Sequence, residues 1–106
     1  MTQSDSLSRF DTELGRVVHR LQVLPDRLRD SAYELIWPVI QELRNMTVAI
    51  DPVGPRDVPR LSSRTAADQL IVVARDLSDR CGDDQWNGSQ WDNAAELLAS
   101  LRRTLP

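Results

Sequence analysis

Apolar residues recur at alternating intervals of three and four from the start of the chain, which is the spacing of one face of a helix. This series predicts a helix over residues 4–24, and a second series with the same period predicts another over residues 26–49. Pro25 separates the two, because proline fits the first turn of a helix but not its interior. Pro38 lies within the second series, where it removes a backbone hydrogen bond, so we expect the second helix to be kinked at this residue.

Residues 51–64 contain three prolines and a glycine, which together exclude a regular helix. A connection of this length is long for a compact domain, and such segments are often functional or mobile. A crossover between two pairs of helices is the simpler explanation. We therefore expect a long Pro-rich crossover loop at residues 51–64.

The second half of the chain predicts two more helices, over residues 65–81 and 90–104. Each starts with the spacing of a capping box, in which a side chain and its acidic neighbour three residues later bind free backbone amides. The alternating pattern of a strand is absent. We predict an all-α, four-helix bundle-like single domain over residues 1–106, in which helices joined by short turns pack antiparallel. The two capping pairs are Thr65 with Asp68 and Ser89 with Asp92.

Composition favours a globular chain, because 41% of the 106 residues are hydrophobic and 27% are charged. The first residues lack the basic start and apolar run of an export signal, and no apolar run is long enough to cross a bilayer. The single cysteine suits a reducing compartment, so we expect a cytoplasmic protein. All thirteen basic residues are arginine, which suggests a GC-rich bacterial genome and excludes chemistry that needs lysine. The net charge of −3 disfavours binding of nucleic acid by the molecule as a whole.

The polar segment at residues 83–94 has the length of a calcium-binding EF-hand loop and places Gly88 sixth, as that loop does. Its twelfth position is Ala94, where an EF-hand needs a bidentate glutamate, so we expect no metal. His19 has no second metal ligand nearby in the sequence, and the acidic neighbours of Cys81 oppose activation of its thiol. These patterns disfavour an enzyme and suggest no cofactor.

Trp86 and Trp91 lie five residues apart, in or beside the polar segment between the last two helices. They have two possible roles. The rings can close one end of the helical core, or they can form an aromatic anchor for a partner protein.

Arg9, Arg16 and Arg20 fall within a narrow arc of the first helix and form a basic stripe. Glu13 lies one turn from two of them and offers local salt bridges. The stripe can be solvated, can face a protein partner, or can contact the phosphates of DNA.

Taken together, these features predict a small non-catalytic helical protein that acts through protein–protein interaction, as a subunit, adaptor or accessory factor. The wide apolar faces further suggest a homodimer. The candidate partner-binding residues are Trp86, Trp91, Arg9, Arg16 and Arg20. A first alternative is a DNA-associated regulator or antitoxin that uses the arginine stripe. A second is a small-ligand pocket or an enzyme with its site inside the bundle, lined by Trp37 and Tyr33 near Pro38.

Overall fold

The computed structural model describes residues 3–52, 54–81 and 86–106, and this part of the chain contains helices and no strand. The prediction of an all-α fold is therefore confirmed. The predicted boundaries are within about three residues of those in the structure. The four α-helices are α1 (Gln3–Gln22), α2 (Arg29–Ile50), α3 (Ala66–Arg80) and α4 (Gly88–Thr104), and two short 3₁₀ turns, η1 (Asp26–Leu28) and η2 (Ser63–Thr65), precede α2 and α3.

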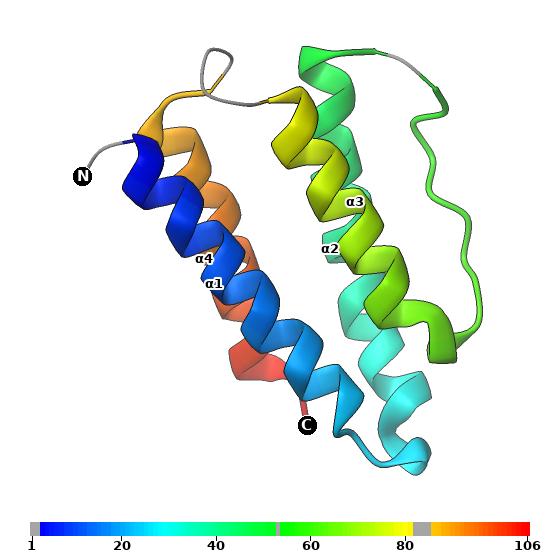
Figure 1. The fold of residues 1–106 in the computed structure, drawn as a ribbon. Coiled ribbons are helices and arrows are strands. Elements are labelled where there is room, and N and C mark those ends of the chain that lie inside the picture. The colour runs from blue at the N-terminus through cyan, green and yellow to red at the C-terminus, as the bar shows by residue number, and fades with distance from the viewer. Residues whose placement is uncertain (1–2, 53, 82–85) are drawn as a thin grey trace.

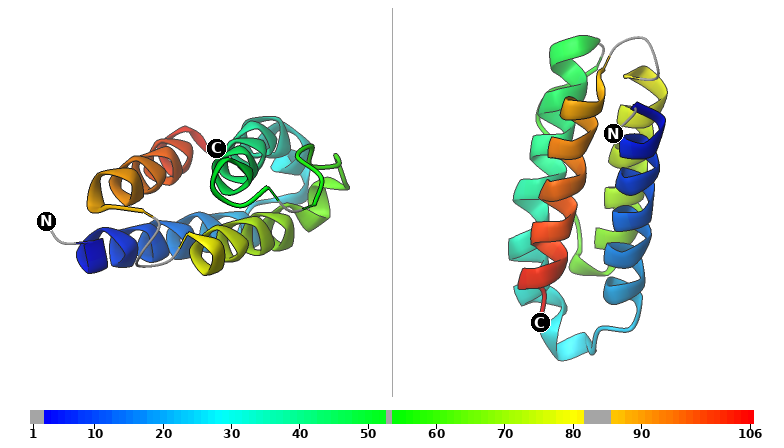
Figure 2. Two further views of the ribbon diagram at one scale, coloured as in Figure 1. Left: turned by 90° about the horizontal axis from the view of Figure 1, so that it is seen from above. Right: turned by 90° about the vertical axis from the view of Figure 1, so that its left-hand side faces the viewer.

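The four helices form two layers, with α1 beside α3 in one and α4 beside α2 in the other (Figure 2). The main packing partners are α1 with α4 and α2 with α3. In each of these pairs the two helices run in the same direction, and the two pairs run in opposite directions (Figure 1). The short turns therefore join helices that run antiparallel, as expected, but each of those helices packs mainly against another partner. α1 begins at one end of the molecule and α4 ends at the other (Figure 1).

The core is made by the apolar faces that the sequence pattern predicts. Each helix contributes side chains that are completely covered, and the core is continuous across all four. No helix in the described residues combines the length and the hydropathy that a membrane span requires. The largest fully buried hydrophobic side chains are Trp91, Phe10, Ile36, Ile40, Leu43, Leu70, Leu77, Leu98 and Val17.

Pro25 and Pro38 can now be placed relative to the first two α-helices. Pro25 has an extended backbone conformation, with φ −60° and ψ 144°, and η1 begins directly after it, which confirms the break between the first two helices. Pro38 lies inside α2, which is continuous from Arg29 to Ile50. The kink at Pro38 stays a prediction.

Both predicted capping boxes are wrong in their residues. Thr65 makes no side-chain cap with α3, and its hydroxyl instead donates to the carbonyl of Ser62. The helical segment begins one short turn earlier, where the Ser62 side chain accepts from the amide of Arg64. At α4 the capping box is formed by Asn87 and Gln90, whose side chains each accept from the other's backbone amide at 3.0 Å. The helix is therefore capped two residues before the predicted cap residue, Ser89.

The segment between α2 and α3 follows the whole length of the helices, along the edge of the molecule that is farthest from α1 and α4 (Figure 1). Such a path is necessary because α2 ends at one end of the molecule and α3 begins at the other. The described residues of this segment are irregular, as predicted, except for the last ones, which form η2. The segment joins two helices that pack against each other, whereas we predicted a crossover between two separate pairs of helices. Residues 55–61 of this segment are called the crossover strap below.

Candidate functional site

The two tryptophans singled out by the sequence lie in the core. The side chain of Trp91 is completely covered and that of Trp86 is 6% exposed. The rings of Trp86 and Trp91 meet edge to face with centroids 4.8 Å apart, and Phe10 of α1 lies 5.3 Å from Trp91. The aromatic cluster closes the core between α1 and α4, and in this conformation neither indole is open to a partner. Their role in partner binding stays a prediction.

The arginine stripe of α1 faces acceptors of its own chain. Arg9 donates to Glu96 at 3.0 Å and lies 3.7 Å from Asp92, both on α4. Arg20 donates to the carbonyl of Leu105 at 3.2 Å. Arg16 donates to Glu13 at 3.0 Å. A partner or a DNA phosphate would have to compete with these acceptors, and a role of the stripe in binding stays a prediction.

Glu13 is the buried centre of this charged network. Its side chain is 7% exposed and accepts from Arg16 at 3.0 Å through one oxygen and from Arg102 of α4 at 3.0 Å through the other. A buried carboxylate needs such partners, because its desolvation is otherwise unfavourable. The network therefore joins α1 to α4 and accounts for the place of Arg102 without a ligand.

The titratable residues were next considered as metal ligands and as nucleophiles. Within the described part of the chain, His, Cys, Asp and Glu side chains nowhere gather in threes that could hold a metal ion, and Asp83 and Gln85 of the EF-hand-like segment lie outside that part. His19 is exposed. Burial raises the pKa of the Cys81 thiol, and the nearby carboxylate of Asp51 raises it further, so the thiol stays protonated at neutral pH.

An open, mostly apolar groove of about 790 Å³ lies between the crossover strap and α3. Its surface includes Val72, which is 67% exposed, and Leu61, which is 51% exposed. Exposed apolar side chains that share one hollow, and are not scattered singly over the surface, are a common mark of a binding surface. We identify this groove as the candidate site.

Side chains of α2 hold residues 55–58, the first part of the crossover strap. Arg44 donates to the carbonyl of Pro55 at 2.9 Å and to Asp76 of α3 at 2.9 Å. Gln41 donates to the carbonyl of Arg56 at 2.9 Å, and its side-chain oxygen accepts from the amide of Val58 at 2.9 Å. These bonds satisfy backbone groups that an irregular segment would otherwise have to expose to water.

Tyr33 and Gln69 hold residues 59–61, the last part of the crossover strap. The Tyr33 hydroxyl donates to the side-chain oxygen of Gln69 and accepts from the amide of Leu61, both at 2.8 Å. Gln69 in turn donates to the carbonyl of Pro59 at 2.7 Å. With the bonds from α2, these contacts fix the strap against two helices, so one wall of the groove is held in place by the chain itself.

Arg60 packs against the aromatic side chains near Pro38. Its guanidinium group lies 5.0 Å from the centre of the Trp37 ring and 5.7 Å from that of Tyr33, and it pairs with Glu34. The two aromatic residues that the sequence suggested for an internal pocket are thus engaged by the strap. An internal ligand pocket at this place stays a prediction without a supporting contact.

The groove carries an excess of negative charge. Arg44 is paired with Asp76. The other charged side chains at the groove are Asp57, Asp68, Asp79 and Arg75, and none of them makes an ion pair within the described residues. Three carboxylates and one guanidinium leave a formal charge of −2 beside the apolar surface.

One feature of the sequence pointed to this groove, although the prediction of the helices did not depend on it. Asp68, Val72, Arg75 and Asp79 follow one another at helical spacing and all are exposed in the structure. Val72 is therefore an apolar residue on an otherwise polar face of α3. The crossover strap that completes the groove could not be placed from the sequence.

No protein-family model, curated protein or solved structure matches the chain.

Proposed function

We propose that the chain is a bundle-like, non-catalytic binding module that acts through protein–protein interaction. Its groove between the crossover strap and α3 takes a short apolar segment of another protein, flanked by arginine or lysine side chains. The observation that carries this proposal is the exposure of Val72 and Leu61 inside one groove whose strap is fixed by hydrogen bonds to α2 and α3.

The fixed strap favours binding because less order has to be gained when a partner arrives. Immobilising flexible groups at an interface costs about 0.5–1.5 kcal/mol per side chain, and a loop that already has its bound conformation avoids much of that cost. The bonds made by Gln41, Tyr33 and Gln69 hold the strap in this way.

The charges of the groove define the chemistry of the partner. Apolar side chains of the partner would cover Val72 and Leu61, and its basic side chains would face Asp57, Asp68 and Asp79. Charges at the rim of an interface mainly increase the association rate and the selectivity. Binding should therefore weaken as the salt concentration rises.

The same charges argue against a second copy of the chain as the occupant. In a two-fold symmetric dimer each copy presents the same surface, so an acidic groove would meet another acidic groove. The homodimer expected from the wide apolar faces remains a separate proposal, and light scattering tests it. The DNA alternative would use Arg9, Arg16 and Arg20, each of which already has an acceptor in its own chain.

A peptide-display selection from a random library tests the proposal and does not require the natural partner. Enriched peptides are synthesised, and their affinities are measured by fluorescence anisotropy for the wild type and for Val72→Glu and Leu61→Glu. Val23→Glu is the matched control, because Val23 is 64% exposed but lies in the turn between α1 and η1, outside the groove. Circular dichroism checks that each variant is folded.

We expect peptides with an apolar centre and basic ends, with affinities that fall about tenfold or more in the two groove variants and stay unchanged in the control. Selection of acidic peptides, of peptides that bind Val72→Glu and wild type equally, or of no peptide would refute the proposal. If light scattering shows a dimer that Val72→Glu dissociates, the groove is an interface between copies.

A further inference from the structure

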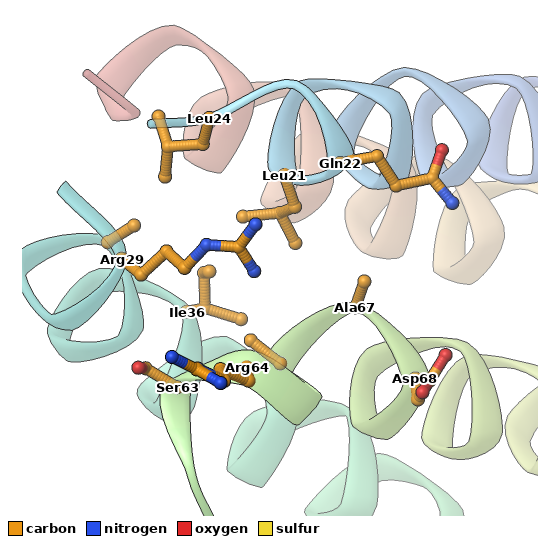
Figure 3. Close-up of a pocket in the computed structure, with 11 residues that line it drawn as sticks. Leu21, Gln22, Leu24, Arg29, Ile36, Ser63, Arg64, Ala67 and Asp68 are labelled. Atoms are coloured by element: carbon orange, nitrogen blue, oxygen red, sulfur yellow. The ribbon is translucent and has the colours of Figure 1, made fainter. Parts of the chain in front are cut away.

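A second, smaller cavity of about 250 Å³ lies at the end of the molecule where α1 ends and α2 begins (Figure 3). It is bounded by the last turn of α1, the first turns of α2, and the segment that runs from η2 into α3. The proposed protein-binding groove lies between α3 and the crossover strap. Asp68 borders both cavities, but their remaining lining residues differ.

One side of this cavity is apolar. Leu21, Leu24 and Ala67 contribute hydrocarbon surface to its lining, and the fully buried Ala32 and Ile36 lie beneath it. An apolar lining favours a ligand with a hydrocarbon body, because both surfaces leave water on binding. The volume is below the range of roughly 300–1,000 Å³ of drug-sized ligand sites, so the ligand must be small.

Two arginines supply hydrogen-bond donors at the same cavity. Arg29 contacts Asp26 through its Nε at 2.7 Å and makes no ion pair with any other residue of the described part of the chain. Arg64 has neither an ion pair nor a side-chain hydrogen bond within the same part of the chain. In Figure 3 the Arg29 guanidinium group extends toward Leu21 and that of Arg64 lies near Ser63, with Ile36 between the two arginines.

The carboxylates nearby leave the charge of Arg64 uncompensated. Asp26 is in contact with Arg29, and Asp30 accepts a hydrogen bond from the hydroxyl of Ser63 at 2.7 Å. Asp68 lies apart from both guanidinium groups and pairs with neither (Figure 3). A guanidinium group presents paired donors that match the two oxygens of a carboxylate.

We propose that this cavity binds a small carboxylate with a compact apolar body. The carboxylate accepts hydrogen bonds from Arg64 and from the terminal nitrogens of Arg29, and the hydrocarbon part lies against Leu21, Leu24 and Ala67. An inorganic phosphate has the charge but no apolar body to cover this lining, so it binds more weakly than the carboxylate.

Benzoate is the probe, and a titration followed by two-dimensional amide NMR on the full chain measures its binding. Benzamide has the same shape without the charge, and inorganic phosphate has the charge without the ring. Arg64→Gln and Arg29→Gln remove the donors, and Ala67→Leu fills the cavity without changing any charge. Arg56→Gln is the matched control, because Arg56 is an exposed arginine of the crossover strap that does not line this cavity.

We expect saturable shifts at the amides of the lining residues with a dissociation constant on the order of 1 mM, as for a ligand of about nine non-hydrogen atoms. Binding should weaken about tenfold in Arg64→Gln, which loses charge-assisted hydrogen bonds, and should be lost in Ala67→Leu. It should be unchanged in Arg56→Gln. If Arg64→Gln does not fold, the Ala67→Leu variant and the comparison with benzamide and phosphate decide the matter. No saturable binding, equal binding of benzoate and benzamide, equal binding of benzoate and phosphate, or benzoate shifts that survive Ala67→Leu would overturn the proposal.

Discussion

Replacement of Trp91 by alanine tests whether the aromatic cluster belongs to the core. The Trp91 ring is completely buried and lies against Phe10 and Trp86, with ring centroids at 5.3 Å and 4.8 Å. If these contacts hold α4 to α1, Trp91→Ala must destabilise the protein in the absence of any partner. If Trp91 is instead an exposed anchor in solution, the change will leave the free energy of unfolding almost unaffected.

The size of the effect follows from the buried surface. A tryptophan side chain buries about 150–250 Å², and at about 25 cal/mol per Å² this corresponds to roughly 4–6 kcal/mol, which is an upper bound. Substitutions of large aromatic core residues by alanine cost about 3–5 kcal/mol. A domain of this size has a total stability of about 5–15 kcal/mol, so Trp91→Ala removes a large share of it.

Urea denaturation followed by circular dichroism at 222 nm measures the change. With a slope of about 2 kcal/mol per M, a loss of 4 kcal/mol lowers the midpoint by roughly 2 M. The exposed Val72→Ala is the control and should shift the free energy of unfolding by less than about 0.5 kcal/mol. If Trp91→Ala is too unstable to fold, Trp91→Phe should still show a loss of about 1–2 kcal/mol. A midpoint for Trp91→Ala equal to that of the wild type would refute the placement of the ring in the core.

Three further changes test the charged and titratable groups. Glu13→Gln removes the buried charge that both its arginines contact and should lower the free energy of unfolding by about 1–3 kcal/mol in urea denaturation, whereas the exposed Glu42→Gln should not. The raised pKa of Cys81 favours the protonated thiol in the folded state, so this contribution to stability is complete below about pH 8.5 and is lost as the pH rises through the raised value. Cys81→Ala should therefore flatten the alkaline decline of the melting temperature, and an identical decline in both proteins would contradict the burial of the thiol. Hydrogen bonds from Arg103 and Arg9 lower the pKa of Glu96. The stability that the charged Glu96 contributes is therefore present above about pH 4.3 and is lost as the pH falls through the lowered pKa. Glu96→Gln should make the fall of the melting temperature at acid pH less steep.

The helices could be predicted from the sequence because their apolar faces are local patterns. The exact starts of α3 and α4 could not, since several residues near each start can cap a helix. Ser89 has the side chain of a cap, but Asn87 lies two residues earlier and its partner Gln90 completes the box. Which residue caps the helix depends on how far packing against the rest of the core extends the helix. A local sequence pattern does not hold this information.

The surroundings of the arginine stripe could not be predicted, because local sequence patterns do not show which helices pack together. Arg9 and Arg16 form a surface stripe if α1 is considered alone, and the sequence shows only Glu13 as a partner. Short turns suggest that α1 packs mainly with α2, but its main partner is α4. Only this long-range contact brings Glu96 to Arg9 and Arg102 to Glu13, where each forms an ion pair.

The parallel packing of α2 and α3 gives both candidate sites a common origin. Two consecutive helices that run in the same direction must be joined by a segment as long as the helices themselves, and residues 51–64 provide it. Along its length this segment forms one wall of the candidate groove beside α3. At its end, η2 brings Ser63 and Arg64 to the junction of α1 and α2 and so completes the smaller cavity. An antiparallel α2–α3 pair joined by a tight turn would need no such segment, so the same helices would have neither site.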